Sequence, residues 1–207
     1  TFSSKLILVP NQLLQDSAFN LTTWLAGKLG VRIARALNRK LTVGSGAKEP
    51  TGVMNVATLG VLCPTGETTT VTADDLMDLE HSVDPAYRAN AVWMLADPTL
   101  KGIKKLKDGA GRYLWTAGLA EGEPGTILGH TYVVNPHMPL PAANAQTIAF
   151  GDFSNYFIRR VRGMQVLRLT ERYADFNQTG FLAFQRWDGN LVDAGTHPVK
   201  YLQQSAS

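Results

Sequence analysis

The chain has 207 residues, of which 44% are hydrophobic and 18% are charged. It can bury a substantial core, either as one large domain or as two small ones. Its net charge of +3 at pH 7 is too small for a dedicated nucleic-acid binder and permits only weak contact with a polyanion. The single cysteine, Cys63, excludes an internal disulfide framework and fits a reducing compartment. No apolar run approaches the roughly 20 residues that span a membrane, so we expect no membrane partner.

The first predicted element is one long helix. After an extended stretch at residues 5–10, Asn11 or Asp16 can cap a helix that runs to about Val43. Apolar residues recur at intervals of four or seven and form one stripe: Leu14, Leu21, Leu25, Leu29, Ile33, Leu37 and Leu41. The opposite side carries Lys28, Arg32, Arg35, Arg39 and Lys40. This basic side is either a surface for nucleic acid or another partner, or a solvated face, and we favour the solvated face.

Two glycine-containing segments resemble phosphate-binding loops only in part. Residues 44–52 combine glycines with Lys48, but they follow a helix, and Glu49 and Pro50 stand where a phosphate loop needs Ser or Thr. Residues 108–111 lack the third glycine of a dinucleotide fingerprint and also follow a predicted helix. We interpret the first segment as a helix end and the second as a turn into a strand at residues 112–115.

The central third is predicted to alternate between helices and strands. Residues 51–63 indicate short extended pieces, and Thr72 is a cap for a helix over residues 73–83. The apolar run Ala91–Ala96 predicts a buried strand. Asp97 and Pro98 then begin a helix that holds the densest positive patch: Lys101, Lys104, Lys105 and Lys107. This patch is the best place for an anionic partner, although a solvated surface is the favoured interpretation.

Residues that could catalyse a reaction or bind a metal are scattered. Asp74 and Asp78 can share a helix face, but no His or third carboxylate lies at ligand spacing, so a solvated helix start is favoured. The histidines do not suggest a zinc site, because His130 and His137 lie across a strand and a turn, and His81 and His197 are distant. No nucleophile elbow occurs, and no signature pairs Cys63 with a histidine. We therefore predict no catalytic residue, no cofactor, no metal ligand and no enzymatic activity.

The last third is predicted to be almost entirely β-strand. Residues 146–153, 156–170 and 181–192 are rich in β-branched and aromatic side chains. Turns are expected at Gly151-Asp152, Gly163 and Asp188-Gly189. The middle strand carries four arginines, which discourage uncontrolled edge pairing or contact a neighbour directly: Arg159, Arg160, Arg162 and Arg168. Residues whose main role is to build strands and edges favour an assembling protein over an enzyme.

Taken in order, these segments resemble the major capsid proteins of tailed bacteriophages with the Hong Kong 97-type fold. The resemblance covers nearly the whole chain. Residues 9–55 are similar to the family's long spine helix and the Pro-Thr-Gly passage after it. The other matching segments are residues 106–115, 127–139, 149–163 and 175–189. No single segment is diagnostic, but their order and spacing together are specific.

The resemblance implies an α+β fold with a long spine helix, a peripheral domain and a mixed-sheet axial domain. The peripheral domain would comprise residues 1–43 and about 181–194. The axial domain would comprise about residues 44–180 and 195–207. The loop at residues 116–126, which has no periodicity, is expected to be exposed and to lie at an inter-subunit contact.

The resemblance also implies a function. Many copies would assemble into an icosahedral shell that encloses the double-stranded DNA of a tailed phage or prophage, with weak and non-specific DNA contact. Scaffold, portal or protease proteins would be further partners. The protein would be located in the virion after assembly in the cytoplasm of the bacterial host.

Some family features are missing before Thr1, namely an N-terminal arm and an extended hairpin loop. We therefore expect a truncated or processed piece of a longer protein, which by itself would stay monomeric or form small oligomers. Some relatives crosslink subunits through a lysine on that hairpin and an asparagine in the late strand region. Asn177 lies near that region, but no crosslinking role is assigned to it.

Two other classes of function stay open. One is a related nanocompartment shell of the encapsulin type, which packages enzymes and not DNA. The other is a hydrolytic enzyme or nuclease, whose site would join a His with Asp or Glu in a deep pocket.

Overall fold

The computed structural model describes residues 1–114, 125–193 and 195–207. The chain forms two compact units, which are described here one at a time. Unit 1 comprises Thr1–Gly52 and Ile158–Gly189, and unit 2 comprises Val53–Phe157 and Asn190–Ser207. The structure thus has the helices and mixed sheets that the α+β prediction requires.

Unit 1 begins with two short strands and two helices. The strands are β1 (Phe2–Ser3) and β2 (Ile7–Pro10), and the helices are α1 (Asn11–Asp16) and α2 (Leu21–Val43). The prediction of one continuous helix was wrong. The Ser17 hydroxyl donates to the Phe19 carbonyl at 2.7 Å, and the Asn20 side chain accepts from the Thr23 amide at 3.1 Å. Asn20 is therefore the cap of α2, because its local hydrogen bond competes with continued helix.

Two long strands complete unit 1 and extend into unit 2, namely β8 (Tyr156–Leu169) and β9 (Gln178–Leu191). Strand β9 is central, since it pairs with β8 and also with β1 and β2, both of which are antiparallel to it. The predicted turns at Gly163 and Asp188-Gly189 were wrong, because both strands continue through these positions. Strand β8 stays continuous although Arg162 has a left-handed backbone conformation, with a φ of 60°.

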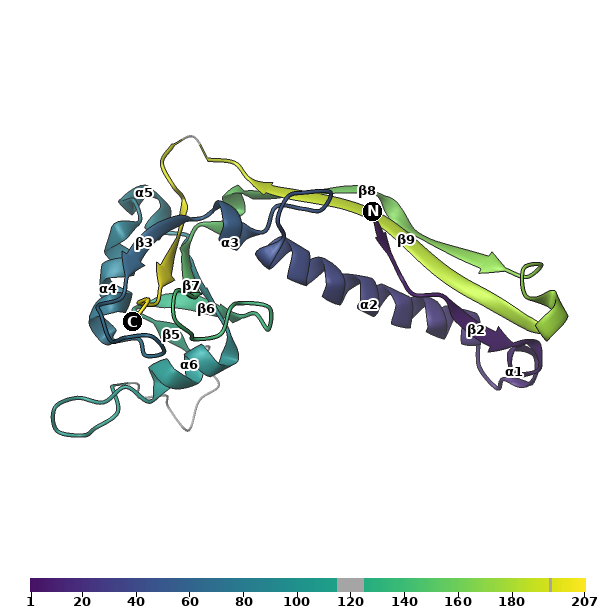
Figure 1. The fold of residues 1–207 in the computed structure, drawn as a ribbon, viewed down its shortest axis with the longest axis horizontal. Helices are drawn as coiled ribbons and strands as arrows, with labels where there is room; N and C mark the ends of the chain where they lie inside the picture. The colour runs from purple at the N-terminus through teal and green to yellow at the C-terminus, as the bar shows by residue number, and fades with distance from the viewer. Residues whose placement is uncertain (115–124, 194) are drawn as a thin grey trace. The chain divides into compact units, whose positions relative to one another are not determined.

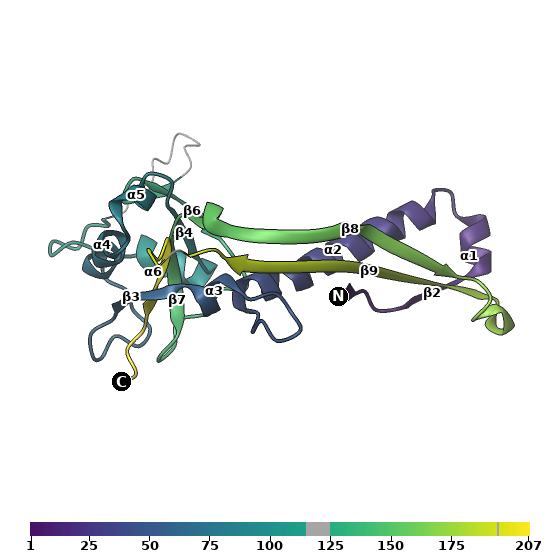
Figure 2. The same cartoon turned by 90° about the horizontal axis from the view of Figure 1, so that it is seen from above.

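The core of unit 1 lies between α2 and one face of this sheet. Leu21, Leu25, Leu29 and Ile33 recur every four residues and pack against Phe181 and Ala183 of β9, with Met164 and Val166 of β8 beside them. Helix α2 accordingly runs along the β8–β9 ribbon in both views (Figures 1 and 2). The predicted apolar stripe of the helix is confirmed, and it explains why residues 158–180 group with unit 1 in the structure rather than with residues 53–157.

Residues 44–52 fold back on the end of α2, which places them in unit 1 although the predicted boundary was residue 43. Gly44 donates to the Lys40 carbonyl at 2.9 Å, and Gly52 donates to the Gly44 carbonyl at 2.8 Å. An added Cβ at Gly44 would lie 2.2 Å from that Lys40 oxygen, and one at Gly52 would lie 2.4 Å from the Gly44 nitrogen. Two backbone segments can therefore approach this closely only where both residues are glycine.

Unit 2 is built on a mixed sheet with short helices. Its first half contains α3 (Val53–Val56), β3 (Thr58–Leu62), α4 (Ala73–Ser82), α5 (Pro85–Arg88), β4 (Val92–Leu95) and α6 (Asp97–Lys104). Its second half contains β5 (Thr126–Ile127), β6 (His130–Val134), β7 (Gln146–Gly151), the 3-10 turn Phe153–Asn155 and β10 (Val199–Gln203). The strand order is β3-β10-β7-β4-β6-β5, with parallel pairs at β3/β10 and β4/β6.

The core of unit 2 lies on one face of this sheet. Trp93 and Leu95 of β4 and Ile148 and Phe150 of β7 alternate along their strands, and each of the four is 0% exposed. Helices α4 and α6 contribute apolar side chains to the same cluster: Leu76, Leu79, Leu100 and Ile103. The predicted buried strand and both predicted helices are confirmed, although α6 ends at Lys104 and not near residue 108.

Two local predictions in unit 2 were wrong. Residues 53–56 form helix α3 where short extended pieces were predicted. The turn at residues 108–111 is present, but of the strand predicted after it the described residues 112–114 form only an isolated bridge from Tyr113 to Lys107. The loop predicted at residues 116–126 lies almost entirely outside the described residues.

Candidate functional site

The sheet of unit 1 has an apolar face that α2 does not cover. Side chains alternate across a strand, so the neighbours of the core residues point to the opposite face. These neighbours, which we call the open face, are Leu8, Leu167, Leu182 and Phe184. Leu8 is 44% exposed and Leu167 is 45% exposed. This sheet face therefore carries accessible apolar side chains, which is typical of an interaction site.

A depression borders the open face at Phe184. It has a volume of about 390 Å³ and is lined by residues that include Gln165, Phe184 and Arg186. It combines an aromatic ring with polar and cationic groups, a mixture that suits recognition of another protein surface.

The outer side of α2 carries the predicted cations together with exposed aromatic residues. Lys28, Arg32, Arg35 and Arg39 are exposed, whereas Lys40 is half-buried. Trp24, which is 50% exposed, stands edge-on to Phe19 with 6.4 Å between ring centroids, and the Lys28 ammonium lies 5.4 Å from its ring. Lys40 instead forms an ion pair of 2.5 Å with Glu49. One predicted cation of this face is therefore used inside unit 1.

Glu49 fixes the segment that follows α2. Its carboxylate accepts from the Ser45 amide at 2.9 Å and from the Ser45 hydroxyl at 3.1 Å, in addition to the Lys40 ion pair. The hydrogen bond from Lys40, with those from Ser45, lowers the pKa of Glu49 from 4.5 to about 2. The glycine-containing segment thus holds its own carboxylate where a phosphate loop would hold an anion.

The predicted candidate residues are dispersed within unit 2. Asp74 and Asp78 are both exposed on α4. His130 Nε2 lies 3.5 Å from Glu80, and His197 Nδ1 lies 2.7 Å from Asp193. The lysines of the basic patch around α6, which are Lys101, Lys104, Lys105 and Lys107, are exposed.

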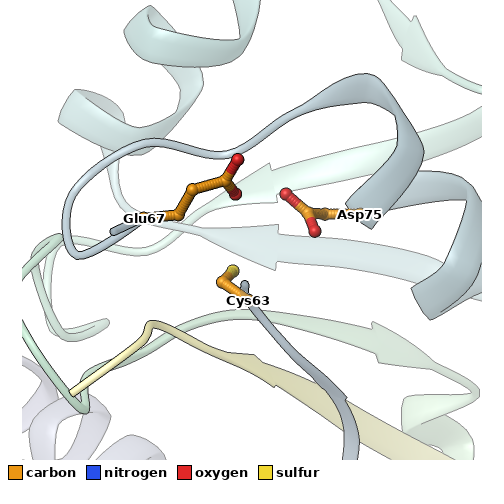
Figure 3. Close-up of side chains that lie close together, drawn as sticks. All are labelled: Cys63, Glu67 and Asp75. Carbon is orange, nitrogen blue, oxygen red and sulfur yellow. The ribbon is translucent and has the colours of Figure 1, made fainter. Parts of the chain in front are cut away.

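The chain instead brings together three residues that the sequence did not single out as a group. Cys63, Glu67 and Asp75 place their ligand atoms within 4.8 Å of one another (Figure 3). No other group of three or more His, Cys, Asp or Glu in residues 1–114, 125–193 and 195–207 has this proximity. Cys63 follows β3, Glu67 lies in the loop before α4, and Asp75 is the third residue of α4.

Each member of this cluster has an identifiable environment. Asp75 is 5% exposed and closes the capping box of α4, where its Oδ2 accepts from the Thr72 amide at 2.8 Å and from the Thr72 hydroxyl at 2.7 Å. Burial, with the charges of Asp75 and Glu67, raises the pKa of the Cys63 thiol to about 12. Burial and the adjacent Asp75 also raise the pKa of Glu67.

Sequence reasoning missed this cluster because its members have no motif spacing. The helix pattern marks Asp74 and Asp75 as first-turn residues, but only the capping box turns Asp75 inward. A buried Cys followed four residues later by Glu is the one local signal, and it is too common to be specific.

None of the helices in the described part of the chain is long and apolar enough to cross a membrane.

A long amphipathic helix packed on extended strands, with an apolar sheet face left accessible, defines a protein that builds structures by association. Comparison with known families names the class. Residues 3–203 match the Phage capsid family. The chain belongs to this family and is a major capsid shell protein.

Solved structures agree with the family and the fold. The capsid of a native GTA particle is 32% identical, with a TM-score of 0.86 over 99% of this chain and 72% of that chain. The capsid of an empty GTA particle is also 32% identical, with a TM-score of 0.85 over 99% of this chain and 73% of that chain. The predicted Hong Kong 97-type fold is thereby confirmed. No match was found among curated proteins.

More distant structures share the fold alone. The protein of Mycobacterium phage Adephagia is 14% identical, with a TM-score of 0.71 over 100% of this chain and 72% of that chain. An encapsulin complex from Synechococcus elongatus is 13% identical, with a TM-score of 0.68 over 98% of this chain and 72% of that chain. The family match and the GTA capsids, rather than these distant structures, show that the chain is a structural protein of virion capsids that associates with copies of itself.

Proposed function

We propose that copies of this chain tile into a closed icosahedral shell that encloses double-stranded DNA. Unit 1 would serve as the peripheral domain and unit 2 as the axial domain. Assembly would take place in the host cytoplasm, with scaffold, portal or protease proteins as further partners. The family membership and the 32% identity to GTA capsids support this proposal.

The open face of unit 1 is the observation that carries the proposal. A monomer with Leu8 and Leu167 each more than 40% exposed on a sheet face leaves apolar surface in water. Burying such surface contributes about 25 cal/mol per Å². A contact repeated in every subunit multiplies this gain across a shell, because closed symmetry uses the same patch in each copy.

The charge of the chain fits a container for DNA rather than a protein that binds DNA tightly. Each phosphate neutralised by Lys or Arg adds a salt-dependent attraction, and a net charge of +3 limits that attraction. Weak contact is what a shell requires if its genome must later leave it.

The open face is tested by a matched pair of substitutions in β8. Gln165 and Leu167 lie on the same side of the strand, and both are exposed. Leu167→Ser should leave the monomer folded, as seen by circular dichroism, and reduce the yield of particles in sedimentation at least several-fold. Gln165→Ser removes no apolar surface and should reduce the particle yield much less than Leu167→Ser does. A normal particle yield for Leu167→Ser would show that the open face is not an assembly contact.

The contents of the particles are tested separately. Particles purified from phage-producing cells should contain DNA that resists added nuclease until the shell is opened. Particles that hold one co-purifying protein and no protected DNA would instead identify an encapsulin-type compartment.

A further inference from the structure

The Cys63–Glu67–Asp75 cluster has one buried carboxyl oxygen whose one available partner in the described residues is the carboxyl group of Asp75, and that hydrogen bond requires a proton on Glu67. This atom, Oε2 of Glu67, is inaccessible to solvent and otherwise has no hydrogen-bond partner there. A buried carboxylate oxygen without a donor is costly, so natural structures seldom leave one without a reason. Figure 3 shows this carboxylate directed toward that of Asp75, with the Cys63 sulfur pointing toward both.

The neighbouring donors are already used. Thr72 donates to Asp75 and not to Glu67. The Gln204 amide, oriented to suit its neighbours, donates to the backbone oxygens of Glu67 at 2.8 Å and Thr70 at 2.9 Å. The Glu67 carboxyl group therefore faces another carboxyl group and a thiol, and in the part of the chain that the structure describes no ion pair joins it to a cation.

The backbone around the cluster is firmly positioned. The Cys63 amide donates to the Gln203 carbonyl at 2.9 Å, and the Gly66 amide donates to the Ser207 carbonyl at 2.6 Å. The Ser205 amide donates to the Glu67 carbonyl at 3.2 Å. The three side chains thus converge from a strand end and a loop that are tied to the C-terminal residues, and from a capped helix. Such a preorganised set is what a bound ion requires.

We propose that Cys63, Glu67 and Asp75 form a binding site for a divalent transition-metal ion of the zinc type. The donor set is one sulfur and two carboxylates, which suits zinc because Zn²⁺ accepts both Cys thiolate and carboxylate oxygen. Binding would release the proton of the Cys63 thiol, and any proton that the two carboxyl groups share, to solvent. Magnesium and calcium avoid sulfur and take six or more oxygen ligands. With three protein ligands, a water molecule would complete a tetrahedral shell.

The spacing of the donors is compatible with this ion. Zinc lies about 2.3 Å from sulfur and about 2.0–2.2 Å from oxygen, so its tetrahedral ligands are roughly 3.5 Å apart. The ligand atoms, which lie within 4.8 Å of one another, would have to close by about 1 Å. Rotation of the Glu67 side chain can supply this movement, because no N–H or hydroxyl donor of the described residues holds its Oε2.

A bound ion would crosslink three segments of unit 2. It would join the end of β3, the loop before α4 and the first turn of α4 in one coordination shell. Because metal that binds only the folded state stabilises that state, unit 2 should become more stable as zinc is added. The inference does not depend on shell assembly, and it is tested on soluble full-length chain.

The direct test is spectroscopic. Metal-free chain, kept reduced with a phosphine, is titrated with Co²⁺ as a probe of the zinc site. The site predicts a near-ultraviolet thiolate-to-cobalt absorption that saturates at one equivalent and is reversed by Zn²⁺. Saturating Zn²⁺, at about 100 times its Kd, should raise Tm by roughly 5–10 °C. If cobalt gives no thiolate absorption, the proposal is overturned.

Two variants and one control locate the ion. Cys63→Ser should lose the absorption, and Glu67→Gln should weaken cobalt binding at least tenfold. Glu67→Gln removes a buried charge and is expected to fold without metal at least as well as the unchanged chain. Asp74→Asn alters the exposed neighbour of Asp75 and should leave binding unchanged. An equal zinc-induced rise of Tm in Glu67→Gln and the unchanged chain would overturn the assignment.

Discussion

The two units use their apolar residues in different ways. In unit 2, two helices pack on one face of a six-stranded sheet around side chains such as Trp93 and Phe150, which are 0% exposed. In unit 1, one helix covers a narrow sheet of long strands, and side chains such as Leu167 on its other face stay accessible. Unit 2 resembles an ordinary domain core, whereas unit 1 leaves part of its apolar surface for a second molecule.

This difference separates stability from assembly. Truncating the core should damage unit 2 most, because a large buried side chain leaves a cavity. Changes in unit 1 should act through caps, tight backbone contacts and exposed surfaces.

The largest effect is expected for Trp93→Ala. Trp93 stacks on Phe150 with 4.2 Å between centroids and donates to the Ile127 carbonyl at 2.9 Å. Its removal should destabilise unit 2 by about 3–5 kcal/mol, measured by denaturant unfolding with amide exchange to localise the loss. Trp24→Ala, at a 50% exposed position in unit 1, should cost less than about 1 kcal/mol. Comparable losses for the two tryptophans would remove the contrast between the units.

The next effect concerns the backbone contact after α2. Gly52→Ala places a Cβ about 2.4 Å from the Gly44 nitrogen, and such overpacking typically costs about 1–3 kcal/mol. Gly27→Ala is the control, because nothing lies within 4 Å of its added Cβ and α2 is helical there. It should stabilise unit 1 by roughly 0.5–1 kcal/mol. Thermal unfolding that moves in the same direction for both variants would contradict this.

A smaller effect is expected at the start of α2. Asn20→Ala removes the side chain that accepts from Thr23 and should cost about 1 kcal/mol. Asp16→Ala alters a residue that ends α1 rather than capping α2 and should change the unfolding free energy by less than about 0.5 kcal/mol. If Asp16→Ala destabilised the chain more than Asn20→Ala in urea unfolding, α2 would not begin at the Asn20 cap.

The smallest effect depends on pH. The pKa of Glu49 falls from 4.5 to about 2 in the folded chain, so the unfolded chain binds its proton more readily. The stability that Glu49 contributes is therefore complete above pH 4.5 and is lost as pH falls toward about 2. Glu49→Gln should lack this part of the acid dependence in denaturant unfolding at low salt. Parallel profiles of unfolding free energy against pH for the two proteins would contradict this role of Glu49.

Regular local patterns were sufficient to predict several elements. The four-residue spacing from Leu21 to Ile33 gave the buried side of α2, and Thr72 with Asp75 gave the capped start of α4. The apolar run around Trp93 gave a central strand. Each depends on interactions between residues that are close in sequence or on a simple period.

Other features depend on distant partners and were not predictable from local patterns. Gly163 suggests a turn, but β8 continues through it and pairs with β9. The predicted division of the chain differs from the two observed units for the same reason, since β8 packs with α2 through Met164 and Val166. Cys63 meets Asp75 only after β3 pairs with β10 and α4 packs against them.

Electron microscopy of the complete gene product, expressed without other phage proteins or with its own scaffold, tests the capsid assignment most directly. We expect closed, icosahedral particles of uniform size whose subunit density fits units 1 and 2. A product that stays monomeric under both conditions, or that forms only irregular aggregates, would contradict the assignment.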